Sequence, residues 1–242
     1  MFMVRCARKV DRDHLMRRGY DLLCRLVPSM RERRRLESMV GPVGVWRALQ
    51  QFQLDCLKRV GLRPHHHLLD VGCGPLQGGL AFIRYLEPAH YVGIDARDPP
   101  VVEARRQVAK AGLTHKSPLV VVSSTFGKDE LGDRTFDYFW ISQLLYHLED
   151  EQIDACFAEV ANRMKPNGRL VGDFIATDGP AIRSDGNWQG FSFFERPFEY
   201  FADLAARHGF KMTCRGKLRD FGYPVKWTYN LSNNELLEFR KN

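Results

Sequence analysis

Several features are scarce or missing in this sequence of 242 residues, and each absence excludes a class of protein. No apolar run reaches the roughly 18 residues that a membrane-spanning helix needs. The first residues lack the apolar stretch of a secretory signal peptide. The six cysteines are scattered without a Cys-x-x-Cys pair, which disfavours a disulfide framework and a zinc site. The sequence therefore predicts a protein of a reducing compartment, and we expect the cytoplasm.

Acidic residues are outnumbered by basic ones near the N-terminus. Residues 1–37 carry eleven Arg or Lys and five Asp or Glu, so +6 of the net charge of +7 lies there. Such a segment attracts nucleic acid, anionic lipid or an acidic substrate. No aromatic residues interleave with the basic run 31–35, which disfavours nucleic acid as a partner. Two interpretations stay open: a solvated helical face, and contact of the basic N-terminus with an anionic surface.

A metal-binding pattern is missing as well, although three histidines are consecutive. Successive side chains of an extended chain point to opposite faces, so His65, His66 and His67 cannot all face one ion. No pattern nearby offers a further ligand. We therefore expect no metal.

The most informative segment that is present is a glycine-rich turn between two acids. One short apolar run ends in Asp70 and a second ends in Asp95, and the turn between them has glycines at 72, 74, 78 and 79. Two strands that each end in a carboxylate, with glycines between them, are typical of a nucleoside-binding edge of an α/β sheet. Glycine lets the backbone approach a ligand. An acid about 20 residues past the turn can accept hydrogen bonds from both ribose hydroxyls, so the nucleoside has no 2′-phosphate.

The glycine spacing differs from that of dinucleotide-binding proteins. Their pattern is Gly-x-Gly-x-x-Gly, whereas three residues separate Gly74 from Gly78 here and Asp70 comes two residues before the first glycine. A nicotinamide-dependent dehydrogenase is therefore the weaker alternative.

Apolar runs alternate with helical patterns along most of the chain. We expect helices at 10–39 and 45–60, separated by Gly41-Pro42. Beyond them the patterns predict strands at 67–71, 90–95, 118–123, 136–142 and 169–175, and helices at 77–86, 100–111, 150–164 and 197–208. Two further extended runs lie at 210–217 and 234–240, joined by a long aromatic loop. This alternation predicts a parallel sheet covered on both faces.

The motif residues resemble those of class I S-adenosylmethionine-dependent methyltransferases. Leu69-Asp70-Val71-Gly72-Cys73-Gly74 is followed by Val92-Gly93-Ile94-Asp95, and the likeness continues at 135–143, 147–148 and 164–171. It covers about residues 60–240. The resemblance implies S-adenosylmethionine as cofactor and a doubly wound, mostly parallel seven-stranded sheet with an antiparallel C-terminal edge hairpin. The expected organisation is an N-terminal helical cap over 1–60 and a cofactor-binding domain over 61–242.

The resemblance also implies which residues contact the cofactor. The glycine turn would lie beside its methionine part, Asp70 would hold its ammonium group directly or through water, and Asp95 would accept the ribose hydroxyls. The expected cofactor-binding residues are Asp70, Gly72, Cys73, Gly74, Gly78, Asp95, Ala96, Arg97, Thr125, Phe126, Ile141, Ser142 and Gln143.

One part of the chain departs from the family pattern. Many members carry an acid after the third strand that accepts a hydrogen bond from the adenine amino group, whereas this chain has Ser123, Ser124, Thr125 and Phe126 there. A hydroxyl or backbone group would then replace the acid, and Phe126 could stack on the ring.

His147 is the predicted catalytic residue. Methyl transfer from a sulfonium is an in-line displacement that depends mainly on alignment of the acceptor. A base is needed only where the acceptor loses a proton early, as a hydroxyl usually must. His147 follows the fourth strand, and an ordinary histidine pKa of about 6.5 suits proton removal. The alternative is a structural histidine that hydrogen-bonds backbone and closes the helix after it.

Acceptor contacts are expected from two aromatic segments, 177–200 and 221–229. In the methyltransferase fold that the chain resembles, the first segment is an insert that covers the opening of the cofactor site. Aromatic faces there can stack on a sugar ring or a planar acceptor. The predicted substrate-binding residues are Tyr146, Trp188, Phe191, Phe193, Tyr223 and Trp227.

The resemblance implies an enzyme that methylates a hydroxyl of a small molecule or glycan. The sequence of the glycine turn is similar to that of bacterial family members that take part in polysaccharide or secondary-metabolite synthesis. A metal-dependent catechol-type enzyme is disfavoured, because no acidic cluster accompanies Ser142. An amine acceptor on a small molecule or peptide, and a non-catalytic cofactor-binding scaffold, are the alternatives.

Overall fold

The structure is a computed structural model that describes residues 27–41, 44–188, 190–224 and 231–241. It divides into two compact units, Met1–Trp46 and Arg47–Asn242. The described part of the first unit contains α2 (Pro28–Glu37), which begins at a proline whose backbone angle suits a first helical turn. Within this unit the Glu37 carboxylate accepts hydrogen bonds from Arg33 Nε and from the Trp46 backbone N–H, both at 3.3 Å. The predicted helix at 10–39 is thus confirmed over 28–37, and its first part lies outside the described residues.

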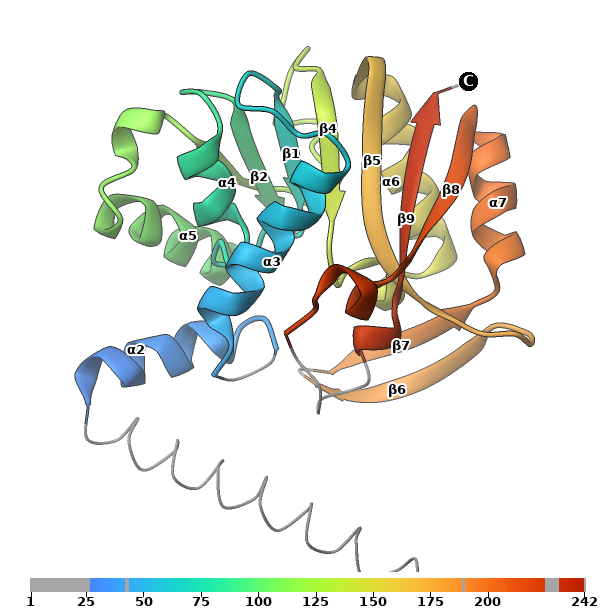
Figure 1. Cartoon of the computed structure of the whole chain (residues 1–242), viewed down its shortest axis with the longest axis horizontal. Coiled ribbons are helices and arrows are strands. Elements are labelled where there is room, and N and C mark those ends of the chain that lie inside the picture. Colours follow the sequence, from blue (N-terminus) through green and yellow to red (C-terminus); the bar gives the residue numbers. More distant parts are fainter. Residues whose placement is uncertain (1–26, 42–43, 189, 225–230, 242) are drawn as a thin grey trace, which may run out of the picture. The chain divides into compact units, whose positions relative to one another are not determined.

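A single nine-stranded sheet organises the second unit (Figure 1). Five strands pair in parallel in the order β3-β2-β1-β4-β5: β1 (Leu68–Val71), β2 (Tyr91–Asp95), β3 (Leu119–Val122), β4 (Phe136–Ile141) and β5 (Met164–Ala176). β9 (Glu235–Lys241) lies antiparallel between β5 and β8 (Phe210–Lys217). The predicted parallel sheet with an antiparallel C-terminal hairpin is confirmed.

Two strands of the insert after β5 were not predicted. β6 (Ile182–Trp188) and β7 (Phe191–Arg196) form an antiparallel hairpin, and the end of β7 pairs in parallel with the end of β5. Residues 182–185 of β6 are all exposed, so the sequence shows no alternation of apolar and polar residues there. This hairpin adds the two strands by which the observed sheet exceeds the predicted one.

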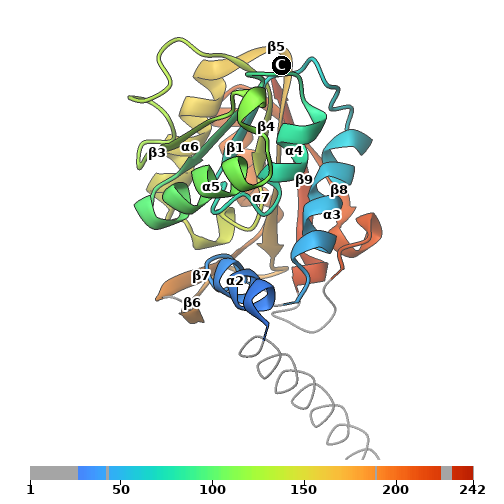
Figure 2. The same cartoon turned by 90° about the vertical axis from the view of Figure 1, so that its left-hand side faces the viewer.

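Helices cover both faces of the sheet, as the alternation of elements predicted (Figures 1 and 2). α3 (Trp46–Arg59) and α4 (Gly79–Tyr85) lie on one face, where Phe82 meets Trp140 edge-on with 6.3 Å between ring centroids. α6 (Asp150–Arg163) and α7 (Phe198–Arg207) lie on the other, where Phe157 meets Phe239 at 4.9 Å. α5 (Asp98–Lys110) packs beside β2 and β3. Short 3₁₀ helices are η1 (Thr114–Lys116), η2 (Leu145–His147), η3 (Leu218–Phe221) and η4 (Leu231–Asn233).

The central strands are buried along their whole length, which is why they read as continuous apolar runs. All residues of β1 and β2 are buried, including the acids that end them. Because both faces are buried, any polar side chain of these strands needs a hydrogen-bond partner. Among the described residues, no helix is both long and apolar enough to cross a membrane.

The packing of α6 against the antiparallel hairpin yields a stability prediction. Phe157 has no exposed surface and contacts both Phe239 and Phe210. Phe157→Ala is expected to lower the free energy of unfolding by about 3–5 kcal/mol, because it removes buried apolar surface and leaves a cavity. Val102→Ala on α5, where the side chain is 54% exposed, is the control and should change it by less than about 0.5 kcal/mol. Urea unfolding measures both, and equal losses would contradict the packing described.

Candidate cofactor and acceptor site

The glycine turn after β1 is held against the end of β2 by backbone hydrogen bonds. The N–H groups of Gly72 and Cys73 donate to the Ile94 carbonyl at 2.8 and 2.9 Å. The Gly74 N–H donates to Asp95 Oδ2 at 3.1 Å. Gly72 and Gly74 have φ of 74° and 52°, a region that favours glycine, and a Cβ on Gly72 would lie 3.0 Å from the Leu144 side chain. The turn therefore requires its glycines.

Asp70 is buried on the face of the sheet that α3 and α4 cover. Its Oδ2 accepts a hydrogen bond from the Tyr91 hydroxyl at 2.7 Å. Burial raises the pKa of Asp70 to about 7, helped by the charge of Asp95 and opposed by the Tyr91 hydrogen bond. A cation bound beside this carboxyl would favour its ionised form.

Asp95 lies at the end of β2 and links the glycine turn to the β6–β7 hairpin. Its Oδ1 accepts from the Arg97 backbone N–H at 3.0 Å and from Arg97 Nε at 3.4 Å. The Arg97 guanidinium lies 5.6 Å from the centre of the Phe191 ring on β7. The hairpin thus reaches the carboxyl end of β2, and Ala96 between the two charged residues is exposed.

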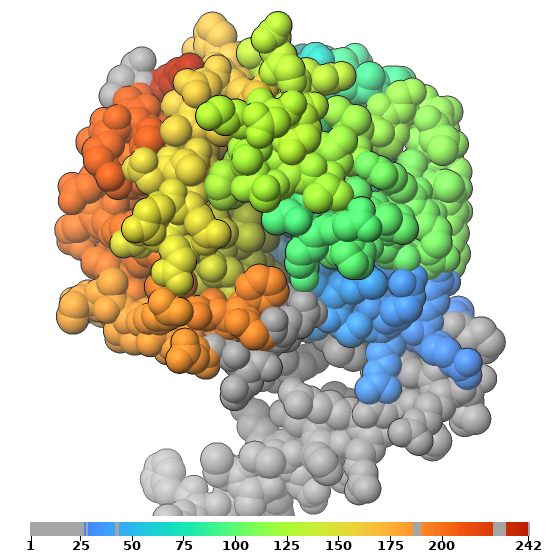
Figure 3. Space-filling view, turned by 180° about the vertical axis from the view of Figure 1, so that it is seen from behind, coloured from blue at the N-terminus to red at the C-terminus, as the bar shows by residue number. Residues whose placement is uncertain are grey.

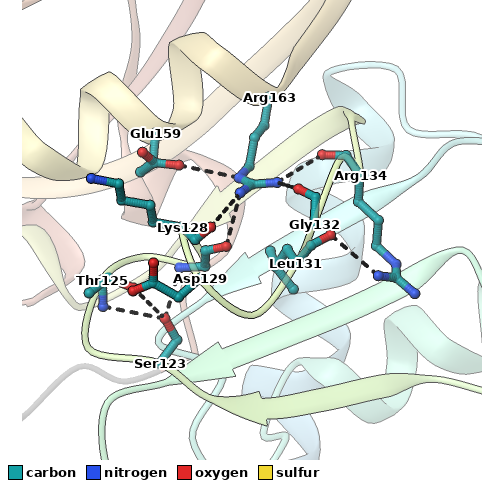
Figure 4. A network of polar contacts seen from close by, with 10 residues as sticks. Ser123, Thr125, Lys128, Asp129, Leu131, Gly132, Arg134, Glu159 and Arg163 are labelled. Carbon is teal, nitrogen blue, oxygen red and sulfur yellow. Dashed lines mark hydrogen bonds and ion pairs between the residues drawn. The ribbon is translucent and has the colours of Figure 1, made fainter.

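The loop after β3 is stabilised by hydroxyl groups and by the side chains of Arg134 and Arg163 (Figure 4). Ser123 Oγ accepts from the Gly127 N–H at 2.8 Å and from the Thr125 N–H at 3.3 Å. Thr125 Oγ1 donates to Asp129 at 3.2 Å. The nearly buried guanidinium of Arg163, on α6, donates to the carbonyls of Gly127, Lys128, Gly132 and Arg134.

Phe126 in the same loop has φ of 56° and packs against the core cluster that α6 and α7 cover. Its predicted stacking on adenine stays a prediction, and the hydroxyls of Ser123 and Thr125 are already partners of the loop itself.

The end of β4 is held by a buried carboxylate that the sequence analysis missed. Asp173 on β5 has no exposed surface; its Oδ1 accepts from the Gln143 N–H and its Oδ2 from Asn234 Nδ2, both at 2.8 Å. Burial raises the pKa of Asp173, while these bonds and one from the Ser142 side chain lower it. Gln143 has φ of 56°, and its Nε2 donates to the Tyr223 hydroxyl at 2.9 Å. An acid within the apolar run 170–176 was the signal that could have revealed Asp173.

η2 places Tyr146 and His147 against β7. Tyr146 is buried and stacks on Phe193, with 5.8 Å between ring centroids and 8° between planes. His147 Nδ1 lies 3.0 Å from the Ser192 carbonyl, and its ring lies 4.6 Å from Phe193 and 5.5 Å from Phe191. Burial lowers the pKa of His147, and the charge of Arg97 lowers it further, against the effect of the Ser192 bond.

The structure therefore brings many of the predicted residues to one edge of the sheet. The glycine turn, Asp70 and Asp95 lie at the ends of β1 and β2. Ile141 ends β4, Ser142 and Gln143 come directly after it, and η2 follows with its two aromatic rings against β7. Gly78 is closely approached by Gln53 of α3, a neighbour that the sequence did not indicate. The Trp188 side chain and Trp227 lie outside the described residues. Among the residues that are described, no group of three His, Cys, Asp or Glu could hold a metal ion.

Comparison with known proteins identifies the domain that carries this edge. Residues 68–168, which run from β1 through the glycine turn, both acids and η2 into β5, match a family described as a methyltransferase domain. These residues form a class I S-adenosylmethionine-dependent methyltransferase domain. The predicted cofactor is confirmed with the family.

Curated relatives of the methyltransferase domain are distant. The sterol 24-C-methyltransferase erg6 of Aspergillus fumigatus is 25% identical over 134 residues, which are 55% of this chain and 34% of that protein. The uncharacterized methyltransferase C1B3.06c of Schizosaccharomyces pombe is 26% identical over 136 residues, 55% of this chain and 48% of that protein. The chain thus spans between a third and a half of the length of these relatives.

Solved structures share the fold of the methyltransferase domain. The glycopeptide N-methyltransferase MtfA matches with a TM-score of 0.61 at 13% identity, over 80% of this chain and 90% of its own. Magnesium protoporphyrin IX methyltransferase (ChlM) from Synechocystis PCC 6803, solved with bound cofactor, matches with a TM-score of 0.60 at 16% identity, over 86% and 89%. At these identities the likeness concerns the fold.

The raised pKa of Asp70 yields a prediction about stability. Because the folded pKa of about 7 exceeds the ordinary 3.8, the protonated carboxyl is favoured in the fold, and stability falls as pH rises between these values. Asp70→Asn should therefore raise the free energy of unfolding at pH 8 by about 1–3 kcal/mol in the absence of cofactor, and should give no gain at pH 4. Urea unfolding at both pH values measures this. A gain that does not depend on pH would contradict the assignment.

Proposed function

We propose that this chain transfers the methyl group of S-adenosylmethionine to a hydroxyl of a small molecule or glycan. The observation that carries the proposal is the pair of acids at the ends of β1 and β2, joined through the glycine turn within a methyltransferase domain. The cytoplasmic location predicted from the cysteine pattern is part of the proposal, and it is supported by Cys56, Cys73, Cys156 and Cys214, which are thiols.

The residues at this edge fit the chemistry of the cofactor. Asp95 offers acceptor oxygens to a ribose diol, and the buried Asp70 carboxyl offers a negative charge to an ammonium group. Glycines at 72 and 74 leave the backbone without side chains at the turn. Gln77 in the same turn is buried, and its Nε2 has no hydrogen-bond partner among the described residues. A ligand carboxylate would satisfy such a donor.

His147 is proposed as the base that removes the acceptor proton. The cofactor supplies a methyl group activated by the sulfonium charge. The Ser192 carbonyl can only accept, so the hydrogen bond requires that His147 Nδ1 carries the proton. In the neutral ring Nε2 then keeps the lone pair that can take a proton from a hydroxyl. The lowered pKa keeps the ring neutral at pH 7, which is the state that a base needs.

The acceptor is proposed to meet aromatic rings of η2 and β7. Tyr146, Phe193 and Phe191 surround His147, and such faces suit a sugar ring or a planar molecule. The similar proteins include sterol, glycopeptide and protoporphyrin methyltransferases, which supports a small-molecule acceptor. They include carbon and nitrogen acceptors, so the hydroxyl is proposed on the geometry of His147.

Cofactor binding is tested by calorimetry with S-adenosylmethionine. The protein should release or absorb heat on binding, and Asp95→Ala should raise the Kd at least about tenfold, because hydrogen bonds to the ribose are lost. Asp203→Ala, an exposed acid on α7, is the matched control and should leave the Kd unchanged. Absence of binding to the wild-type protein, or equal Kd values for it and Asp95→Ala, would overturn the proposal.

The acceptor class is tested with radiolabelled cofactor and a panel of hydroxyl-bearing and amine-bearing small molecules. His147→Ala should lower kcat for a hydroxyl acceptor by roughly 10²-fold or more, because the base is removed, and should leave the Kd for the cofactor within about twofold. A small effect of His147→Ala would indicate an amine acceptor and would contradict the role of His147.

A further inference from the structure

Strand β7 contacts η2 at two points, and the second involves a residue without an assigned role. At one end of the strand the Ser192 carbonyl accepts from His147. At the other end lies Arg196, whose side chain is 3% exposed. A fully buried guanidinium is costly unless its donors are satisfied, so its partners show what it is there to hold.

The Arg196 side chain bonds backbone carbonyls on both sides of Tyr146 and His147, and we call this set of contacts the clamp. Its Nη2 donates to the Leu148 carbonyl at 2.7 Å and its Nη1 lies 3.4 Å from the Leu145 carbonyl. These two carbonyls bracket Tyr146 and His147. Nη2 and Nε also donate to Asp150 Oδ1, at 2.8 and 3.0 Å, where α6 begins.

The guanidinium of Arg196 is itself held between two aromatic rings. It lies 4.6 Å from the centre of the Phe194 ring and 5.0 Å from that of Tyr200. Planar stacking and a fork of donors are properties of arginine that lysine lacks. The space-filling view from behind shows the hairpin residues (orange) lying against those of α6 (yellow), the neighbours that this clamp joins (Figure 3).

We propose that Arg196 is a positioning residue that fixes the place and the tautomer of His147. By holding the carbonyls on either side of Tyr146 and His147 and the start of α6, Arg196 keeps the His147 ring against the Ser192 carbonyl of β7. Phe193 lies between Ser192 and Arg196 on β7 and stacks on Tyr146, which adds a third contact between β7 and η2. The catalytic meaning of this placement rests on the proposed function, whereas the placement itself is measured without acceptor or turnover.

Long-range ¹H–¹⁵N NMR of the histidine rings in the full chain tests the inference. His147 is assigned by comparison with His147→Gln. In the wild-type protein at pH 7.5 Nδ1 should be protonated and Nε2 unprotonated. In Arg196→Met the two tautomers should mix, and the pKa of His147 should rise toward 6.5, because burial is lost. Calorimetry with S-adenosylmethionine should show a Kd within about twofold of wild type, since the clamp lies outside the cofactor contacts.

A matched control exists on the same hairpin. Arg183 has a side chain that is 58% exposed, pairs with Glu149 at 3.2 Å and lies 5.5 Å from the centre of the Phe194 ring. It donates to the Ser192 hydroxyl at 3.4 Å, whereas His147 bonds the Ser192 carbonyl, and among the described residues Arg183 contacts no carbonyl of η2. Arg183→Met should therefore leave the His147 tautomer and pKa as in wild type. If Arg196→Met does not fold, Arg196→Lys serves, because one ammonium group cannot span both carbonyls, and mixed tautomers are again expected.

The outcomes separate this inference from the proposed function. If the folded Arg196 variant keeps the His147 tautomer and pKa of the wild-type protein, the proposed role of Arg196 is overturned, whether or not the cofactor binds. If Arg183→Met changes the His147 tautomer and pKa as much as Arg196→Met does, the role of Arg196 is also overturned, because loss of any positive charge on the hairpin would then produce the effect. Failure of the wild-type protein to bind S-adenosylmethionine overturns the proposed function and leaves the NMR result standing.

Discussion

The hydrogen bond from the Gly74 N–H to Asp95 Oδ2 joins the two strands on which the site depends. Together with the bonds from the Gly72 and Cys73 N–H groups to the Ile94 carbonyl, it holds the turn at residues 72–74, which has no bulky side chain, against the end of β2. The same packing brings Asp70 and Asp95 close enough for the charge of one to raise the pKa of the other. The buried Asp70 carboxyl, with its raised pKa, lowers the stability of the fold at neutral pH, and a cationic ligand group beside it would offset that cost.

The acceptor side of the site is assembled from segments far apart in the sequence. Asp173 of β5 holds the backbone of Gln143, and Asn234, just before β9, holds Asp173 in turn. β7 holds η2 through Arg196 and Ser192. Apart from the bond between the Asn234 and Asp173 side chains, each of these contacts joins a backbone group to a side chain from a distant segment, so the geometry of the β4 end follows from interactions that only the folded sheet creates.

The parallel sheet and the cofactor edge could be predicted because their signals are local. Strands buried on both faces read as apolar runs, and Asp70, the glycines and Asp95 stand at fixed positions beside them. The β6 strand could not be predicted, since residues 182–185 are all exposed and three of the four are polar. Arg196 gave no signal because its partners are carbonyls about 50 residues away. The observed bond of His147 to backbone also agrees with a structural histidine, and sequence alone could not separate the two roles.

A crystal structure of the chain with S-adenosylhomocysteine tests the account most directly. The ribose hydroxyls should lie within hydrogen-bond distance of Asp95, with the amino acid part of the ligand beside Asp70 and the glycine turn. A structure in which the ligand binds elsewhere, or in which protein atoms fill the space beside the turn while Asp95 faces no sugar, would contradict it.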